Sequence, residues 1–160
     1  MLKVILDTTP ILTLLKISKF SLLKDIYEKI IIPEGVYQEI EIGKNKEYYI
    51  NLAELEWVKI EKIKNNQAIK YLADLDKGEA EVIVLAEEIN ADIVVIDEKI
   101  GREYAKRNNL NLTGTLGILI KAKNKRLIKA IKPLIDEMQN KGVWLNDKLI
   151  ISVLKITGEK

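Results

Sequence analysis

The chain has 160 residues, of which 48% are hydrophobic and 31% are charged, and its formal net charge is +2. These values indicate a globular protein with room for a sizeable core, and the small net charge does not by itself indicate a nucleic-acid binder. The sequence contains neither cysteine nor histidine, which excludes disulfides, thiolate and imidazole chemistry and the usual zinc sites. Catalysis must therefore rest on carboxylates, hydroxyls, amines or a metal held by oxygen.

The first predicted strand ends in a carboxylate. Residues 2–6 form an almost unbroken apolar run rich in branched side chains, which is typical of a strand buried on both faces of a parallel sheet. Asp7 follows, and Thr9 and Pro10 fit the N-cap and the first position of a helix that continues to Ile17. We therefore expect Asp7 at the carboxyl end of a central strand, where open α/β sheets place their ligands.

Several elements follow before the middle of the chain, and one of them carries a second acid. The pattern predicts a helix over 19–28 capped by Ser18, a strand over 30–32 closed by Pro33, a helix over 34–42 ended by Gly43, a helical excursion over 44–56, an edge strand or extended connector over 58–63 and a helix over 66–75. Glu39 lies on the helix over 34–42, beside the apolar face that Val36 and Ile40 form.

The second half of the chain supplies two more acids. Asp76 precedes a helix that carries Glu79 in its first turn and ends near Asn90; this helix is predicted to be central because residues 82–86 are all apolar. A β-branched strand over 91–96 again ends in an acid, Asp97. The remaining pattern predicts a helix over 98–108, a strand over 111–113, a helix from Thr115 to Lys123, a helix from Pro133 to before Gly142, a short strand over 143–145 and a last helix, capped by Asn146, that ends at about Ile156.

Strands and helices alternate along the whole chain. This alternation indicates an α/β fold in which a central parallel sheet lies between two layers of helices. There is no internal repeat or linker, so we expect one domain over residues 1–160, with the C-terminal part, about 124–160, as a candidate helical extension.

The four acids Asp7, Glu39, Glu79 and Asp97 come from separate segments and are expected to meet at one edge of the sheet. Like charges packed together require compensation, and with oxygen ligands alone this favours Mg²⁺ or Mn²⁺. Such a site can orient a phosphate and lower the pKa of a bound water. Each acid also has a structural interpretation, as a helix cap, a charge at a helix N-terminus or a solvated residue.

Four segments together resemble the motifs of the PIN-domain nucleases. The resemblance is carried by residues 4–9, by 32–39 with its Pro33 before a helix, by 78–86 and by 94–98. Gly101, Arg102 and Ala105, with residues 113–119, resemble one branch of that family, known mostly as predicted nucleic-acid-binding proteins of unassigned role. The resemblance covers nearly the whole chain and implies a PIN-like fold.

The resemblance also implies an activity, namely a metal-dependent endoribonuclease that is often the toxin of a toxin–antitoxin pair. It implies that Asp7, Glu39, Glu79 and Asp97 are catalytic, with Asp7, Glu79 and Asp97 as ligands of Mg²⁺ or Mn²⁺. Two positions depart from the family pattern: many members have Asp where Glu79 stands, and the further acid of the fourth motif is here Glu98, which is expected to point elsewhere if it begins a helix. Glu81 is the alternative to Glu79 for the role in the site, but it is expected to be solvated.

The candidate nucleic-acid contacts are Lys99, Arg102, Thr8 and Thr115, whose alternatives are a solvated face and ordinary helix caps. Trp57 and Trp144 are expected to pack rather than stack on bases. The expected partners are RNA, an antitoxin protein and a second copy of the chain. No apolar run reaches the roughly 20 residues of a membrane helix and no signal peptide is evident, so we expect a cytoplasmic protein.

Two other functions fit parts of the same pattern. A non-catalytic PIN-like module could use the same scaffold to bind nucleic acid or protein. A receiver-like phosphoacceptor domain could use Asp97 as the phosphorylated residue and Lys132 as its lysine.

Overall fold

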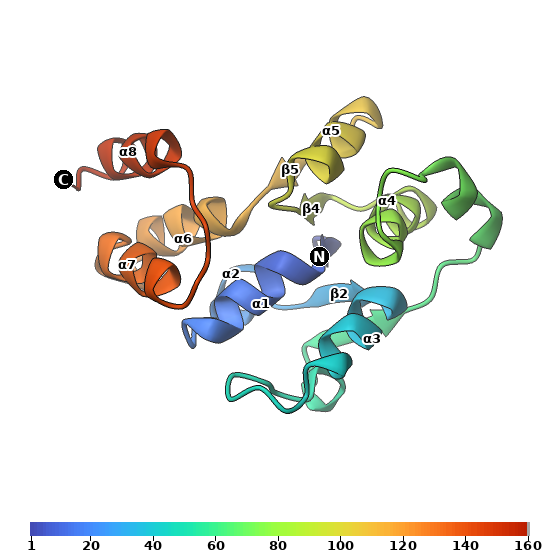
Figure 1. The fold of residues 1–160 in the computed structure, drawn as a ribbon, viewed down its shortest axis with the longest axis horizontal. Helices are drawn as coiled ribbons and strands as arrows, with labels where there is room; N and C mark the ends of the chain where they lie inside the picture. Colours follow the sequence, from blue (N-terminus) through green and yellow to red (C-terminus); the bar gives the residue numbers. More distant parts are fainter. Residues whose placement is uncertain (160) are drawn as a thin grey trace.

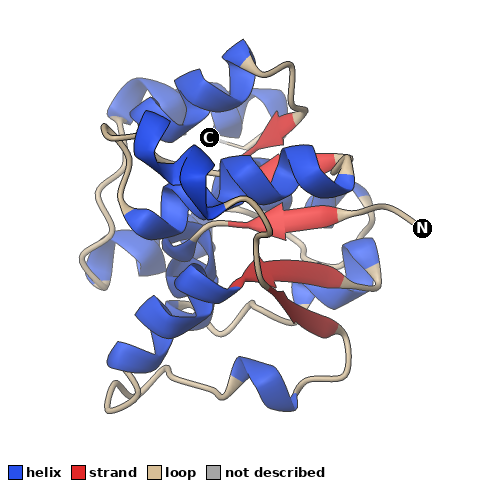
Figure 2. Cartoon of the chain, turned by 90° about the vertical axis from the view of Figure 1, so that its right-hand side faces the viewer, coloured by secondary structure: helices blue, strands red, loops and turns tan. Residues whose placement is uncertain are grey.

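The computed structural model describes residues 1–159, and within them one sheet contains five strands. The strands are β1 (Val4–Leu6), β2 (Ile30–Pro33), β3 (Val58–Glu61), β4 (Ile93–Val95) and β5 (Leu112–Thr113). Their order is β3-β2-β1-β4-β5, and every neighbouring pair is parallel. Helices lie on both sides of the sheet (Figure 2), so the predicted three-layer α/β/α fold with a central parallel sheet is confirmed.

Eight α-helices connect and cover the strands in the described residues. They are α1 (Thr8–Lys16), α2 (Leu22–Tyr27), α3 (Glu34–Ile42), α4 (Lys77–Ile89), α5 (Lys99–Arg107), α6 (Thr115–Asn124), α7 (Lys132–Asn140) and α8 (Asp147–Ile156). Figure 1 shows α6, α7 and α8 gathered on one side of the molecule, and α3 and α4 on the other. None of the helices formed by residues 1–159 has the length and apolar character that crossing a membrane requires.

The two central strands carry the two acids that were expected to share a rim. β1 pairs with β4 so that Leu6 lies opposite Val95, and the Asp7 N–H donates to the Val95 carbonyl at 3.0 Å. The chain moves from β1 to β2 and β3 on one side and from β4 to β5 on the other. The carboxyl ends of β1 and β4 therefore form a topological switch point, the place where open α/β sheets bind ligands.

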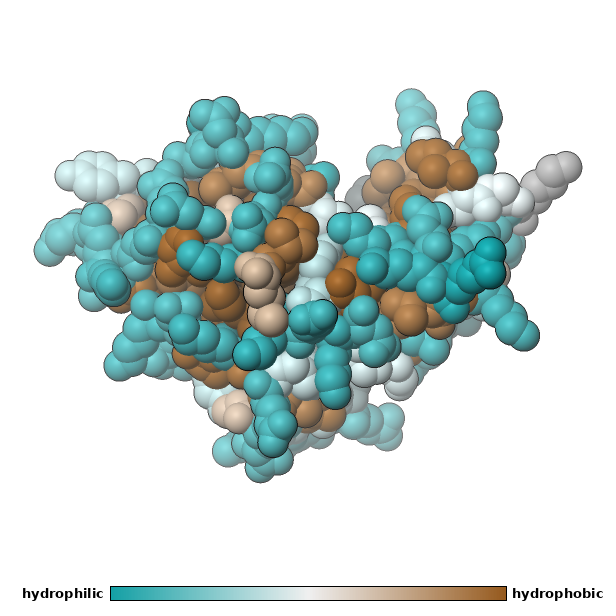
Figure 3. All heavy atoms as spheres, turned by 180° about the vertical axis from the view of Figure 1, so that it is seen from behind, coloured by the Kyte–Doolittle hydropathy of each residue, from teal (hydrophilic) through white to brown (hydrophobic). Residues whose placement is uncertain are grey.

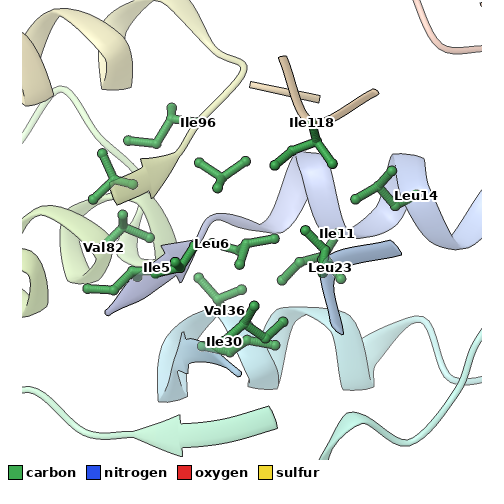
Figure 4. Packing of buried hydrophobic residues seen from close by; sticks show 14 of the residues in the cluster. Ile5, Leu6, Ile11, Leu14, Leu23, Ile30, Val36, Val82, Ile96 and Ile118 are labelled. Atoms are coloured by element: carbon green, nitrogen blue, oxygen red, sulfur yellow. The ribbon is translucent and has the colours of Figure 1, made fainter. Parts of the chain in front are cut away.

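The core joins the sheet to its helices (Figure 4). Ile5 and Leu6 of β1 and Ile30 of β2 are fully buried, and Val36 of α3 and Val82 of α4 pack into the same cluster. Each such side chain stabilises the fold by about 1.5–3 kcal/mol through removal of its apolar surface from water. This packing fixes β1 and β4, and with them the ends that carry Asp7 and Asp97.

Some local predictions were wrong because a cap or a turn replaced the expected element. Asp7, not Thr9, is the N-cap of α1, since its Oδ1 accepts the Thr8 N–H at 2.7 Å. Ser18 has φ 56° and caps no helix, and α2 begins only at Leu22.

Three expected elements are absent or reduced. Residues 44–56 are mostly turns with one 3₁₀ turn at Leu52–Glu54, and Asn66–Tyr71 is a 3₁₀ helix rather than part of a longer α-helix. None of the residues Asn66–Tyr71 is fully buried, and only Ala68 and Ile69 are partly buried against the core, so little apolar burial stabilises an α-helix there. Residues 143–145 form no strand, because the Val143 N–H donates to the Met138 carbonyl at 2.9 Å and closes the end of α7.

Candidate functional site

Asp7 is buried at the end of β1, with only 2% of its surface exposed. The protein supplies it with one hydrogen bond, from the Thr8 N–H at 2.7 Å, because the residue caps α1. The pKa of Asp7 is raised from 3.8 to about 7, mainly by burial and also by the negative charges of Asp76, Glu98 and Glu39, while the hydrogen bond from Thr8 opposes the rise. Asp7 is thus a buried acid surrounded by other acids, an arrangement that favours a bound cation.

Glu39 reaches the same region from α3. Its Oε2 accepts the Thr8 hydroxyl at 2.8 Å. Gly78, in the first turn of α4, leaves the space for this contact: a Cβ there would lie 3.1 Å from Glu39 Oε2 and 3.5 Å from Thr8 Oγ1. The close approach of α3 and α4 therefore brings Glu39 beside the residue that follows Asp7.

Glu79 and Asp76 form a capping box at the start of α4. The Glu79 N–H donates to Asp76 Oδ1 at 2.8 Å, and the Asp76 N–H donates to Glu79 Oε1 at 3.4 Å. The pKa of Glu79 is raised to about 8, mainly by burial and also by the neighbouring Asp76 and Glu98. The other carboxylate oxygen, Oε2, faces α5, because a Cβ on Gly101 would lie 3.3 Å from it.

Asp97 follows β4 and is held by the start of α6. Its Oδ1 accepts the Thr115 N–H at 2.7 Å, and its Oδ2 accepts the Thr115 hydroxyl at 2.5 Å. Burial raises the pKa of Asp97, while these hydrogen bonds and the positive charge of Arg102 oppose the rise. A Cβ on Gly114 would lie 2.7 Å from Asp97 Oδ1 and 3.1 Å from Arg102 Nη1, so only glycine allows this close packing.

The structure adds two acids that sequence reasoning did not assign to the site. Asp76 raises the pKa of both Asp7 and Glu79, and Glu98 raises the pKa of Asp7, Glu79 and Asp97. Glu98 does not begin α5 but stands at its N-cap position, and its Oε1 accepts the Thr9 hydroxyl at 2.9 Å. Glu98 was expected to point elsewhere only if it began the helix, and that condition is not met. The signal for Asp76 was its position three residues before Glu79, as in a capping box.

Glu81, expected to be solvated, is only 5% exposed. Its Oε1 accepts the Gly35 N–H at 2.9 Å, at the beginning of α3. A negative charge at a helix N-terminus is favourable, so Glu81 joins α4 to α3 and has a structural partner of its own. This explains its burial without a role beside Asp7.

The candidate nucleic-acid contacts divide into two groups. The hydroxyls of Thr8 and Thr115 are buried and both donate to acids, Glu39 and Asp97. Arg102 is partly buried and donates to the Ile96 carbonyl at 2.7 Å, whereas Lys99 is exposed at the beginning of α5. Of the four, Lys99 alone presents its polar group mainly to solvent.

A groove of about 680 Å³ leads to the Asp97 side of the site. Asp97, Glu98, Lys99 and Arg102 line one wall, and residues 143–146 with Leu149 line another. Figure 3, which shows the molecule from behind, has a notch between the lobe formed by α6–α8 and the rest of the surface. A ligand in the groove would contact both the acids and the C-terminal helices.

The donor chemistry fits a hard divalent cation, because every candidate ligand is an oxygen and the negative charges oppose one another. The side chains are not preassembled around one point: within residues 1–159 no three acids are placed so that they could hold a metal ion together. Each is turned toward a protein donor, Asp7 toward Thr8, Glu79 toward Asp76, and Asp97 toward Thr115. Binding of a cation would therefore require some of these side chains to move toward one point.

Comparison with known families gives one match. The model of the family DUF3368, described as a PIN domain, matches residues 3–159. No curated protein and no solved structure matches the chain significantly. The matched range includes all six acids at the switch point.

Proposed function

The chain belongs to the PIN-domain family, and from this premise we propose that it is a metal-dependent endoribonuclease that hydrolyses RNA phosphodiester bonds. PIN domains are generally nucleases. The observation that carries the proposal is the environment of Asp7, whose pKa is raised to about 7 by burial and by the charges of Asp76, Glu98 and Glu39 at the switch point of the sheet. A buried acid beside other negative charges destabilises a fold, and acids with a pKa raised in this way are concentrated at functional sites.

We assign roles to the residues as follows. Asp7, Glu79 and Asp97 would hold Mg²⁺ or Mn²⁺, with Glu39 as the fourth catalytic acid. The ion would supply a water of lowered pKa and compensate negative charge on the phosphate. Thr115 fixes the orientation of the Asp97 carboxylate through two hydrogen bonds.

The basic and hydroxyl residues take different roles in this proposal. Lys99 would contact the phosphate backbone, and its exposure and its position in the lining of the groove, next to Glu98, support this role. Arg102 holds the end of β4 through the Ile96 carbonyl. Thr8 positions Glu39, so its contribution to nucleic-acid binding is indirect.

Cleavage of a labelled single-stranded RNA by the purified chain tests the proposal. We expect activity with Mg²⁺ or Mn²⁺ that EDTA abolishes, and a loss of about 100-fold or more in Asp7→Asn and in Asp97→Asn. The matched control is Asp25→Asn, because Asp25 is exposed on α2. Cleavage that persists both in EDTA and in Asp7→Asn would refute the assignment.

A non-catalytic PIN-like binding module is the second candidate, and one observation favours it: no three acids of the described chain are arranged to hold a metal together. Calorimetric titration separates the two functions. Binding of Mn²⁺ that Asp7→Asn abolishes supports the nuclease, and absence of binding at millimolar Mn²⁺ supports the module. The receiver-like alternative has no support, because Lys132 begins α7 instead of lying on a strand.

Family membership motivates further proposals about context. We propose that residues 1–160 form one domain, that the protein is cytoplasmic and homodimeric, and that it is the toxin of a toxin–antitoxin pair. α6 packs against α1 and α2, which supports one domain. Limited proteolysis tests whether the chain forms one domain, and light scattering tests whether it forms a dimer. Growth of cells after induced expression tests whether it is toxic.

A further inference from the structure

Trp144 is the most conspicuous side chain of the C-terminal region that the proposed activity does not use. It was expected to pack, but 82% of its surface is exposed. Trp57, by contrast, is partly buried and packs against Phe20, with the two ring centroids 5.2 Å apart. The exposed indole offers a large, rigid aromatic surface with which a ligand could pack.

The position of Trp144 connects it to the candidate site. It lines the groove of about 680 Å³ that Asp97 and Glu98 also line. A ligand that fills this groove would contact both Trp144 and these acids. The wall around it is apolar, with Met138, Leu145 and Leu149.

The backbone holds Trp144 at both sides. On one side the Val143 N–H donates to the Met138 carbonyl at 2.9 Å and closes α7. On the other side the Asn146 side chain accepts the Lys148 N–H at 2.8 Å and caps α8. Only one residue separates Trp144 from Asn146, so the indole projects from a short segment that is anchored at both ends.

Charge is unevenly distributed along the sequence. Residues 121–160 contain ten basic and four acidic residues, whereas residues 1–120 contain 16 basic and 20 acidic residues. The C-terminal part that carries Trp144 is therefore basic, and the part that carries all the site acids is acidic. In the groove itself the basic side chains are Lys99 and Arg102, and these would attract the phosphates of a nucleic-acid strand.

We propose that Trp144 is a stacking platform for an unpaired base of single-stranded RNA whose phosphate backbone runs through the groove toward Asp97. An aromatic ring accepts the face of any base, but only a base outside a duplex can offer its face. Trp144 would thus select single-stranded over double-stranded substrate. This role rests on the proposed nuclease function, since the neighbouring acids make the groove a route to the reaction.

Binding measured without cleavage tests the role of Trp144. The full chain in EDTA is titrated against a fluorescein-labelled oligouridine of about 12 nucleotides, and binding is followed by fluorescence anisotropy. We expect Trp144→Ala and Trp144→Leu each to weaken binding about tenfold or more, and Trp144→Phe to retain most of the affinity. The leucine variant matters because it keeps apolar surface but removes the aromatic face.

The controls separate stacking from other effects. Tyr71→Ala removes another aromatic side chain, 85% exposed and absent from the lining of the groove, and should leave binding unchanged. Unchanged circular dichroism checks the fold of each variant. A duplex of the same length should bind equally to the parent chain and to Trp144→Ala.

Three outcomes would overturn the role. They are equal affinity of Trp144→Ala and the parent chain, full affinity in Trp144→Leu, and loss of self-association in Trp144→Ala with RNA binding unchanged, which would make this surface a contact between copies of the chain. The nuclease proposal fails separately: RNA binding that depends on Trp144, with no cleavage in Mg²⁺ or Mn²⁺, would refute the activity and retain the stacking role.

Discussion

Replacement of Asp7 by asparagine should abolish activity and at the same time stabilise the metal-free protein. In the unfolded chain this carboxyl ionises near pH 3.8, whereas in the folded protein its pKa is about 7. Below pH 3.8 the group is neutral in both states, and folding carries no charge penalty. As the pH rises from 3.8 to about 7, the folded state loses stability, and above pH 7 the full penalty remains.

The magnitude follows from the pKa difference of about 3 units, at about 1.4 kcal/mol for each unit. Asparagine is uncharged at every pH, and its amide oxygen can still accept the Thr8 N–H that caps α1. We therefore expect Asp7→Asn to raise the free energy of unfolding by about 4 kcal/mol at pH 8, by about 2 kcal/mol at pH 5 and by almost nothing at pH 3.

Urea unfolding in EDTA, followed by circular dichroism at these three pH values, measures the effect. Asp25→Asn is again the control, because Asp25 is exposed and should give no such pH dependence. Added Mn²⁺ should raise the melting temperature of the parent chain but not that of Asp7→Asn. Two results would refute the reasoning: an Asp7→Asn variant less stable than the parent at pH 8, or a gain in the free energy of unfolding that does not decrease from pH 8 to pH 5. Either would show that the Asp7 carboxylate is not destabilised by burial and by neighbouring negative charges.

Three other substitutions probe the contacts around the site and the C-terminus. Gly114→Ala should reduce RNA cleavage and lower stability by about 1–3 kcal/mol in urea unfolding, because its Cβ would lie 2.7 Å from Asp97 Oδ1. Gly35→Ala should lower the free energy of unfolding by a similar amount, since its Cβ would lie 2.6 Å from Glu81 Oε2. In a double-mutant cycle, adding Glu81→Ala should relieve much of that clash. Glu159→Gln should lower the free energy of unfolding by about 2 kcal/mol at neutral pH, because the Glu159 carboxylate accepts hydrogen bonds from the Lys123 ammonium at 2.8 Å and from the Ile131 N–H at 2.9 Å. The folded pKa of Glu159 is lowered to about 2, so the contribution of this residue should be present above pH 4.5 and be lost as the pH falls through 2, which acid titration of parent and variant would show.

Several elements could be predicted from the sequence because their signals are local. The branched apolar runs before Asp7 and Asp97 gave β1 and β4, and Pro33 and Gly43 bounded α3 as predicted. Both acids consequently lie at the ends of neighbouring central strands. A run that must be buried on both faces admits few other positions in an α/β fold.

Burial of charged side chains could not be predicted in the same way. Glu79 and Glu81 are two residues apart in one helix, and both are buried, but they have different partners. Glu81 accepts the N–H of Gly35, 46 residues away, while Glu79 bonds to its own helix cap. Helical periodicity predicts the direction in which each side chain points, but it does not predict which hydrogen-bond donor the side chain meets in the folded protein.

The sequence by itself determined the layer architecture, the oxygen-only chemistry and the strand ends on which two acids stand, because these follow from composition and from the period of apolar residues. Only the tertiary structure decided that Asp76 and Glu98 join those acids and that Trp144 remains in water beside their groove. The physical reason is that repulsion between acids and the solvent exposure of a side chain depend on distances between segments far apart in the sequence. A local sequence pattern does not contain those distances.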